Sequence, residues 1–151
     1  MTIKKKISIK NVKFGKNVTI IEPVNLYGCT IGDDCFIGPF VEIQKNVEIG
    51  KNCRIQSHTF ISENTVIGND CFIGHSTVFV NDKFHKNKIL SREEPFLKTK
   101  IGNNVLIGSN VTILPVKIDS NVTVGAGSVV TKNCQKNSIY VGNPARVLKK
   151  L

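Results

Sequence analysis

The chain has 151 residues, of which 40% are hydrophobic and 12 are glycine, a composition typical of one globular domain, here 1–151, and not of a disordered or collagen-like chain. It contains no run of eighteen apolar residues and no apolar leader segment, so we expect a cytoplasmic protein with no membrane partner. The formal net charge of +10 suits anionic partners, but the absence of Trp and of any recognition motif argues against nucleic acid.

An aliphatic residue returns at every sixth position along most of the chain. Isoleucine fills eight consecutive places of this register from Ile31 to Ile73, and Phe79 fills the ninth. A weaker version begins at Phe14, and one residue is lost between Ile113 and Ile118. After an interruption the register continues through Ile101, Ile107, Ile113, Ile118, Val124 and Val130. This pattern predicts a series of short strands, one in each hexad.

The other places of the hexad indicate how the strands are joined. A small or branched residue stands two places before the aliphatic one, and both side chains therefore face the same, inner side of a strand. Glycine often follows the aliphatic residue, and Asn or Asp comes two places later, where a corner with positive φ is tolerated. Three hexads make an 18-residue triangular coil, and about six coils stack as parallel strands into a β-solenoid. The pattern leaves the handedness open.

The hexads resemble the isoleucine-patch repeat of the hexapeptide acyltransferases, over about residues 8–147. The resemblance implies an all-β fold, a left-handed parallel β-helix, with a long extruded loop at about 85–100 and a short C-terminal tail. It also implies a homotrimer with active sites between subunits. The same fold carries zinc carbonic anhydrases and ice-binding proteins, so the repeat alone does not establish the function.

The largest interruption of the repeat, His85 to Lys100, contains no hexad. Loops of this length without regular structure are usually functional, although a surface insertion is the alternative.

One corner departs from the Asn/Asp rule. Residues 18 apart stack on neighbouring coils, so Phe40, His58 and Ser76 form one column, and His75 lies beside it. We consider His58 and His75 candidate catalytic bases; the alternative is two exposed polar residues on a turn.

The corner from which the loop leaves carries a second polar group. Lys45, Glu63 and Asn81 are predicted to stack in one column, with Asp82 beside Asn81. This set provides carboxylate and amide groups for an amine or for sugar hydroxyls, and ordinary turn chemistry is the alternative. Glu63 is also a candidate base.

A metal site is not expected. Cys35, Cys53 and Cys71 lie 18 residues apart at inward places, in single file, whereas zinc ligands must converge on one point. We therefore interpret them as small core residues of a reducing compartment. His85 at the start of the loop does not complete a zinc site with the other histidines, and the threonines form no flat outward array for ice binding.

The closing segment, including Asn143-Pro144-Ala145-Arg146, resembles the terminal coil of coenzyme A-dependent family members. That likeness implies acetyl-CoA as co-substrate. Residues with tiny side chains let the pantetheine arm approach the backbone, and basic residues lie near the phosphates. The implied contacts are Gly108, Ser109, Ala126, Gly127, Lys132, Pro144, Arg146 and Lys149. A solvated tail is the alternative for the basic residues.

The acceptor is inferred from a second likeness. Sugar O-acetyltransferases of this fold carry a His where this chain has Leu97-Lys98-Thr99-Lys100, and an alcohol needs such a base more than a neutral amine does. The run from Ile55 to Glu63, with Gly74-His75 and Asn81-Asp82 before a loop, resembles the dTDP-3-amino-3,6-dideoxyhexose 3-N-acetyltransferases, which supply surface-polysaccharide precursors.

We therefore expect acetyl transfer to the 3-amino group of a dTDP-linked sugar, bound by Lys45, Glu63, Asn81, Asp82 and Phe84. Backbone N–H groups near Gly74 or Gly108 are candidate oxyanion donors. The leaving thiolate could itself take the proton, so that no residue is an essential base.

Three alternatives remain open. A UDP-linked 3-amino-uronate acetyltransferase needs a further cation, which Lys86 or Arg92 could supply. A sugar O-acetyltransferase and a non-enzymatic solenoid are the other two.

Overall fold

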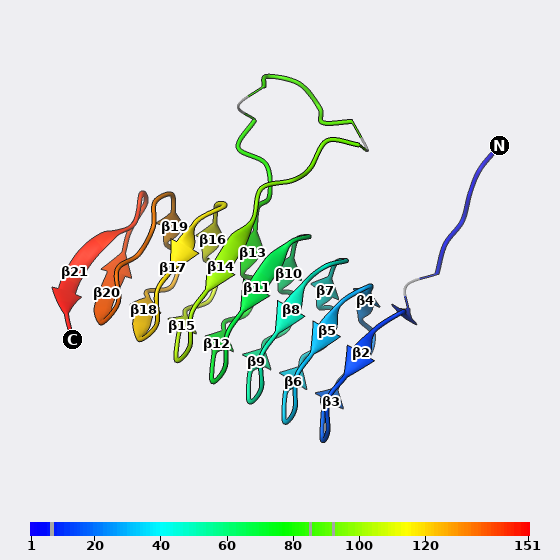
Figure 1. Ribbon diagram of the computed structural model, residues 1–151, viewed down its shortest axis with the longest axis horizontal. Coiled ribbons are helices and arrows are strands. Elements are labelled where there is room, and N and C mark those ends of the chain that lie inside the picture. The colour runs from blue at the N-terminus through cyan, green and yellow to red at the C-terminus, as the bar shows by residue number, and fades with distance from the viewer. Residues whose placement is uncertain (7, 85, 92) are drawn as a thin grey trace.

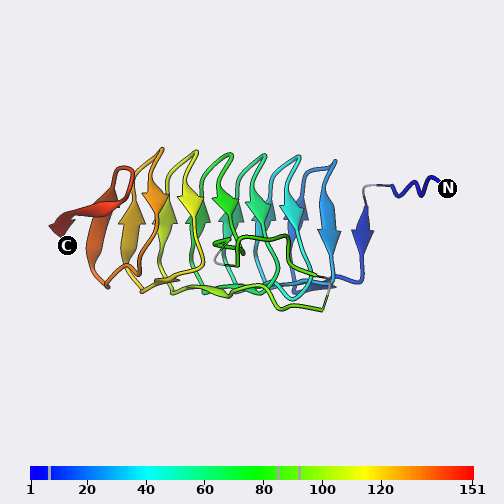
Figure 2. The same ribbon diagram turned by 90° about the horizontal axis from the view of Figure 1, so that it is seen from above.

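The computed structural model describes residues 1–6, 8–84, 86–91 and 93–151, and these residues form a left-handed parallel β-helix (Figure 1). Each coil contributes one short strand to each of three sheets, so that the strands lie side by side along the axis (Figure 2). The strands pair in parallel, apart from the last strand of the chain, which is antiparallel to its neighbour. The expected fold is therefore confirmed, including the handedness that the hexad pattern left open. Among the described residues no helix is long and apolar enough to cross a membrane.

The three sheets are named here in the order in which the chain enters them. Sheet A consists of β1 (Ile9–Lys10), β4 (Asn25–Tyr27), β7 (Glu42–Ile43), β10 (Phe60–Ile61), β13 (Val78–Phe79), β16 (Thr112–Ile113) and β19 (Val129–Val130). Sheet B consists of β2 (Lys13–Phe14), β5 (Thr30–Ile31), β8 (Glu48–Ile49), β11 (Thr65–Ile67), β14 (Thr99–Ile101) and β17 (Lys117–Ile118). Sheet C consists of β3 (Thr19–Ile20), β6 (Phe36–Ile37), β9 (Arg54–Ile55), β12 (Phe72–Ile73), β15 (Leu106–Ile107), β18 (Val122–Val124), β20 (Ser138–Val141) and β21 (Arg146–Lys150).

The core is the column of aliphatic residues predicted from the hexads. Ile31, Ile37, Ile43 and their successors are fully buried, as is Phe79. In the register of each sheet they lie directly above one another, for example Ile43 beside Ile61. Each such side chain removed from water contributes about 2 kcal/mol, so the stacked isoleucines are the main source of stability.

Three corners connect the sheets. The His corner joins sheet C to sheet A and comprises residues 38–41, 56–59, 74–77, 108–111 and 125–128. The loop corner joins sheet A to sheet B and comprises residues 44–47, 62–64, 80–98 and 114–116. The Asn corner joins sheet B to sheet C and comprises residues 32–35, 50–53, 68–71, 102–105 and 119–121.

The long loop begins and ends earlier than expected. β13 ends at Phe79 and β14 begins at Thr99, so residues 80–98 form the projecting loop (Figure 1). The long loop predicted at about 85–100 is confirmed, except that Thr99 and Lys100 belong to β14. Thr99 and Lys100 pair with β11, and Thr99 is buried at the inward place two before Ile101. His85 and Arg92, which the sequence singled out, lie outside the described residues.

Candidate functional site

The predicted column at the His corner exists and is longer than expected. Phe40, His58 and Ser76 all have positive φ, and the column continues to Asn110 and Gly127. The backbone N–H of each donates to a carbonyl of the preceding coil: that of His58 to Pro39 at 3.1 Å and that of Asn110 to His75 at 2.8 Å. These hydrogen bonds fix the position of each of these corner residues along the axis of the β-helix.

His58 and His75 differ in their surroundings on this corner. The ring of His58 is stacked on that of Phe40, with centroids 4.8 Å apart and an angle of 17° between the planes. His75 lies in the neighbouring column, between Ser57 and Ser109, because the carbonyls of Ser57, His75 and Ser109 accept the successive N–H groups of the first column. Both histidine side chains are exposed.

The four small residues expected at the cofactor lie on the two coils that follow His75. Gly108 and Ser109 stand directly beyond Gly74 and His75, and Ala126 and Gly127 one coil further. A Cβ on Gly74 would lie 2.5 Å from the carbonyl carbon of Gly108, so the coils approach as closely as glycine allows. These four residues therefore form one continuous surface, the small-residue surface, and His75 lies at its edge on the preceding coil.

Of the backbone N–H groups near Gly74 and Gly108, those of the two glycines are already engaged. The N–H of Gly74 donates to the carbonyl of Ile107 at 2.9 Å and that of Gly108 to Val124 at 2.8 Å, as the parallel ladder requires. The glycine N–H groups themselves are therefore not the donors, and the prediction of an N–H near Gly74 or Gly108 rests on their neighbours. In contrast, among the described residues no protein acceptor takes the N–H of His75 or of Ser109.

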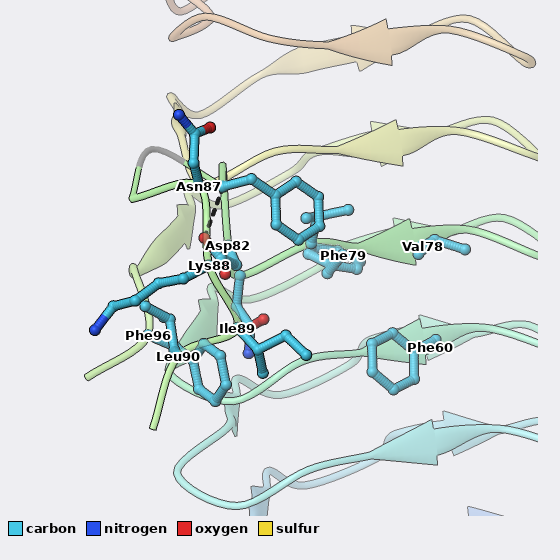
Figure 3. A pocket seen from close by; sticks show the side chains of 12 residues that line it. Phe60, Val78, Phe79, Asp82, Asn87, Lys88, Ile89, Leu90 and Phe96 are labelled. Carbon is cyan, nitrogen blue, oxygen red and sulfur yellow. Dashed lines mark hydrogen bonds between the residues drawn. The ribbon is translucent and has the colours of Figure 1, made fainter. Parts of the chain in front are cut away.

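A pocket of about 600 Å³ opens on the outer face of sheet A, beneath the loop (Figure 3). Phe60 and Val78 form its floor, and each follows the His corner by two residues, from His58 and Ser76 respectively. The remaining lining residues are Phe79, Val80, Asn81, Asp82, Phe84, Asn87, Lys88, Ile89, Leu90 and Phe96. The pocket is thus mostly apolar, with a few polar groups at its rim.

Asp82, the third residue of the loop, does not continue the corner. Its Oδ1 accepts the N–H of Phe84 at 2.7 Å, and Phe84 has a φ of 54°. Asp82 itself is not among the residues with positive φ, unlike Asn64 one coil earlier, so the expected stacking of corner residues stops here. The turn instead directs Phe84 to the pocket.

A second pocket, of about 470 Å³, lies at the loop corner. Lys45 Nζ and Glu63 Oε2 are 3.5 Å apart, and Asn46 Nδ2 donates to Asn64 Oδ1 at 3.4 Å. The loop residues Leu90, Ser91, Glu93, Glu94, Pro95 and Phe96 close it. Leu90 and Phe96 line both pockets, so the loop is a shared wall between them.

The structure consequently divides the predicted substrate residues. Asn81, Asp82 and Phe84 line the first pocket, and Lys45 and Glu63 line the second. Glu63 is on the loop corner, across sheet A from His58 and His75, so the three candidate bases are not brought together within one chain.

Charge pairs stabilise the loop itself. Glu94 Oε1 lies 2.6 Å from Lys86 Nζ and 3.3 Å from Lys88 Nζ, and the other carboxylate oxygen accepts the N–H of Ser91. The hydrogen bond from Lys86, followed by that from Ser91, lowers the pKa of Glu94 to about 2. Leu97 then returns the chain to the coil through its N–H on the carbonyl of Asn81.

A polar network that the sequence analysis missed lies beside the first pocket. The two carboxylate oxygens of Glu42 accept hydrogen bonds from Asn25 Nδ2 at 3.0 Å and Gln44 Nε2 at 3.1 Å. Burial, and then the nearby charges of Glu42 and Glu63, raise the pKa of Tyr27. The signal was present in the outward places of sheet A, where Asn25, Glu42 and Phe60 stand in register.

The C-terminal hairpin of β20 and β21 is joined to the His corner. The N–H of Ala145 donates to the carbonyl of Val129, and that of Gly142 to Ser128 Oγ. Pro144 and Arg146, exposed on either side of Ala145, therefore lie next to the small-residue surface.

The predicted basic residues do not form one cluster. Arg146 pairs with Val141 near the His corner, whereas Lys149 pairs with Ile139, about 10 Å further along the hairpin. Lys132 follows β19, at the loop corner.

Cys35, Cys53 and Cys71 are buried in single file behind the Asn corner, as predicted. Each thiol donates to the carbonyl of a glycine on the following coil, at 3.1 to 3.2 Å. Their sulfur atoms act as core hydrogen-bond donors. In the part of the chain that the structure describes, no three His, Cys, Asp or Glu side chains are grouped so that they could hold a metal ion.

Two family profiles match parts of the chain. The profile described as "Bacterial transferase hexapeptide (six repeats)" matches residues 28–63, and "Hexapeptide repeat of succinyl-transferase" matches residues 98–132. A curated relative, the bifunctional protein GlmU of Streptococcus uberis, is 36% identical over 136 residues, 88% of this chain. The chain spans only 30% of the length of that relative.

Several solved structures share the fold. A variant of AntD, an N-acyltransferase from Bacillus cereus solved with dTDP and coenzyme A, is 27% identical with a TM-score of 0.81, over 91% of this chain and 83% of that one. A second AntD variant, solved with dTDP-4-amino-4,6-dideoxyglucose and coenzyme A, is 25% identical with a TM-score of 0.58, over 93% and 83%. A maltose O-acetyltransferase from Clostridium difficile 630 is 25% identical with a TM-score of 0.62, over 95% and 69%.

Proposed function

The chain belongs to the hexapeptide-repeat acyltransferases, and we propose that it transfers an acetyl group from acetyl-CoA to the amino group of a dTDP-linked amino sugar. One observation carries this proposal: His75 lies on a continuous surface with the small residues Gly108 and Ser109, three residues before the pocket floor at Val78. The acyl donor and the acceptor thus have adjacent places on either side of one histidine.

The small-residue surface suits the pantetheine arm. Ala126 and Gly127 are exposed, and Ser109 is half-buried, so a thin chain can lie against the backbone there. Pro144 and Arg146 border the same surface, where the Arg146 guanidinium supplies positive charge for a phosphate. Lys132 and Lys149 lie farther from this surface, so we assign them only a long-range electrostatic attraction to the phosphates of CoA.

The pocket suits a deoxy sugar. Phe60 and Val78 offer apolar contact for a methyl group and for ring C–H bonds, while Asn81 and Asp82 offer hydrogen bonds to an amine and a hydroxyl at the rim. Phe84 closes the side of the pocket that faces the loop. A sugar with fewer hydroxyl groups fits such a lining better than maltose does.

The reaction then proceeds by direct attack. The neutral amine nitrogen bonds to the thioester carbonyl carbon, the carbonyl oxygen becomes an oxyanion, and the C–S bond breaks when the oxyanion collapses. The N–H groups of His75 and Ser109, which have no protein acceptor in the described chain, are the donors that we assign to the oxyanion. The imidazole of His75 accepts the surplus proton from nitrogen and passes it to the sulfur as the C–S bond breaks, so that CoA leaves as the thiol and the imidazole returns to its neutral form.

Lys45 and Glu63 belong to a second part of the proposed site. They line the pocket on the loop corner, away from His75 of the same chain. We infer a homotrimer in which the loop corner of one subunit lies near the His corner of the next, since this brings both halves of the acceptor site together. Light scattering should then give about three times the chain mass of 16.7 kDa.

The proposal includes the position of the amine. The 3-amino group of a dTDP-linked 3-amino-3,6-dideoxyhexose is our first candidate, on the resemblance around Glu63 and Asn81. A 4-amino group is the second, because AntD was solved with dTDP-4-amino-4,6-dideoxyglucose.

Thiol release from acetyl-CoA tests these assignments with a panel of dTDP-linked 3-amino and 4-amino sugars, UDP-linked 3-amino sugars, and maltose. Turnover with a dTDP-linked amine supports the proposal and selects the position. Turnover with only the UDP-linked sugars would indicate a UDP-linked 3-amino sugar N-acetyltransferase, and turnover with only maltose would indicate a sugar O-acetyltransferase. No turnover and no CoA binding would exclude the acyltransferase.

A further inference from the structure

Two aromatic residues occupy corner positions that disfavour them. At Phe40 and His58 φ is 61°, a left-handed conformation that Asn and Asp adopt with less strain. The Asn corner uses Asp34, Asn52 and Asp70 at the same place of the hexad. Strained residues of this kind persist where the surrounding structure holds them, and they gather at binding and catalytic sites.

The two rings form a stack that is open to solvent. Their planes are nearly parallel, and 56% of Phe40 is exposed. The side of Phe40 away from His58 faces the preceding coil, where the carbonyl of Pro23 accepts the N–H of Phe40. A small pocket of about 150 Å³ adjoins it, lined by Pro23, Val24, Asn25, Phe40, Val41 and Glu42. This surface can receive one planar group.

A fixed hydrogen-bond acceptor lies on the wall of this small pocket. Glu42 is held by Asn25 and Gln44, one on each carboxylate oxygen, so its orientation is set before a ligand arrives. Each oxygen keeps a second lone pair for a ring N–H. An aromatic face beside a carboxylate matches a pyrimidine that presents an imide N–H, as thymine and uracil do.

The small pocket lies next to the proposed sugar pocket. Glu42 and Phe60 are register partners on β7 and β10, so the two sites lie one coil, about 5 Å, apart. Phe40 lies two coils, about 10 Å, from His75. That distance is within the reach of a ligand whose base and amino sugar are separated by a ribose and a diphosphate.

We propose that Phe40, stacked on His58, is the platform for the pyrimidine ring of the nucleotide sugar, with Glu42 accepting its ring N–H. The assignment deepens the proposed function and rests on it for the identity of the ligand. It also gives His58 a binding role, distinct from the proton acceptance assigned to His75.

A direct binding measurement tests the platform without any turnover. The chain has no Trp, so Phe40→Trp introduces a single Trp at the site, whose fluorescence can be excited selectively at the long-wavelength edge where the two Tyr residues do not absorb. We expect dTMP and UMP to quench it, and adenosine 3′,5′-bisphosphate, the nucleotide end of CoA, not to do so. Quenching by the adenosine nucleotide alone would overturn the assignment and would show that the ring stack binds the adenine of CoA instead.

Replacement by the residue that suits the backbone separates binding from folding. Phe40→Asn removes the ring but relieves the corner, so Tm should stay equal or rise by about 2–4 °C while the affinity for dTMP falls about tenfold, measured by calorimetry. His58→Asn should act in the same direction, and Glu42→Gln should weaken dTMP binding without loss of the fold. Phe14→Leu, which alters a 41%-exposed Phe on sheet B, is the matched control for removing a ring.

The outcomes distinguish this inference from the proposed function. Turnover of a dTDP sugar with an unchanged KM in Phe40→Asn would overturn the platform alone. Quenching by dTMP without acyl transfer to any amine would keep the platform and overturn the reaction. Loss of oligomeric mass in Phe40→Asn, with dTMP affinity unchanged, would show instead that the ring contacts a second copy of the chain.

Discussion

The His corner and the Asn corner have the same backbone but different side chains. At the Asn corner, amides and carboxylates of successive coils bond to one another, as from Asn52 Nδ2 to Asp70 Oδ1 at 2.8 Å and from the N–H of Asn69 to Asn103 Oδ1 at 2.8 Å. At the His corner the same places hold aromatic rings, imidazoles and tiny side chains. Because the His corner lacks this ladder of side-chain hydrogen bonds between coils, its outward groups are free to bind a ligand.

Glycine substitutions should show that the two corners share their packing. Gly74→Ala places a Cβ 2.5 Å from the carbonyl carbon of Gly108, and Gly68→Ala places one 2.6 Å from the carbonyl oxygen of Gly102. We expect each to lower the free energy of unfolding by about 3 kcal/mol, because backbone atoms must move. Urea denaturation measures this, and a loss below about 1 kcal/mol at Gly74 alone would mean that the His corner is packed more loosely.

Replacing the residue two places after the buried isoleucine should affect kcat at the His corner and not at the Asn corner. His75→Ala is expected to lower kcat about a hundredfold, since it removes the proton acceptor. Asn69→Ala, at the corresponding place of the Asn corner, should leave kcat unchanged. Both are read in the thiol-release assay. Small losses for His75→Ala, His58→Ala and Glu63→Ala alike would indicate that the leaving thiolate takes the proton.

The Asn corner should respond in stability and not in activity. Asn52→Ala loses the hydrogen bond to Asp70 and puts Ala at a φ of 56°, so we expect about 2 kcal/mol of destabilisation. Thermal unfolding should show it, and the kcat of the folded variant should equal that of the parent. A tenfold loss of kcat would contradict the separation of roles.

The interior behind the corners should show the smallest effect. Burial raises the pKa values of Cys29 and Cys134 to about 11, which reduces the thiolate fraction near pH 8 about a hundredfold relative to an ordinary thiol. All five cysteines are buried, so the native protein should resist a thiol reagent that labels all five in denaturant. Rapid labelling of one or two would identify a coil that opens.

Much of the scaffold could be predicted because its geometry is periodic. A spacing of 18 residues placed Phe40, His58 and Ser76 in one column, and the inward places identified the buried isoleucines and cysteines. The start of β14 was missed although Thr99 occupies an inward place of the hexad. The lost residue before Ile118 shortens the loop corner at 114–116, away from the small-residue surface.

The sequence by itself determined the coil, the corners and the order of residues along each column, because every coil repeats the same contacts with its neighbours. Only the tertiary structure decided the course of residues 80–98, the two pockets that this loop separates, the stacking of Phe40 on His58, and the network around Glu42. These features depend on non-periodic contacts between side chains of different coils. They also depend on N–H groups whose hydrogen-bond partners the hexad pattern does not predict. The N–H groups of Gly74 and Gly108 show this most plainly, since the parallel ladder engages both of them and leaves only their neighbours as donors.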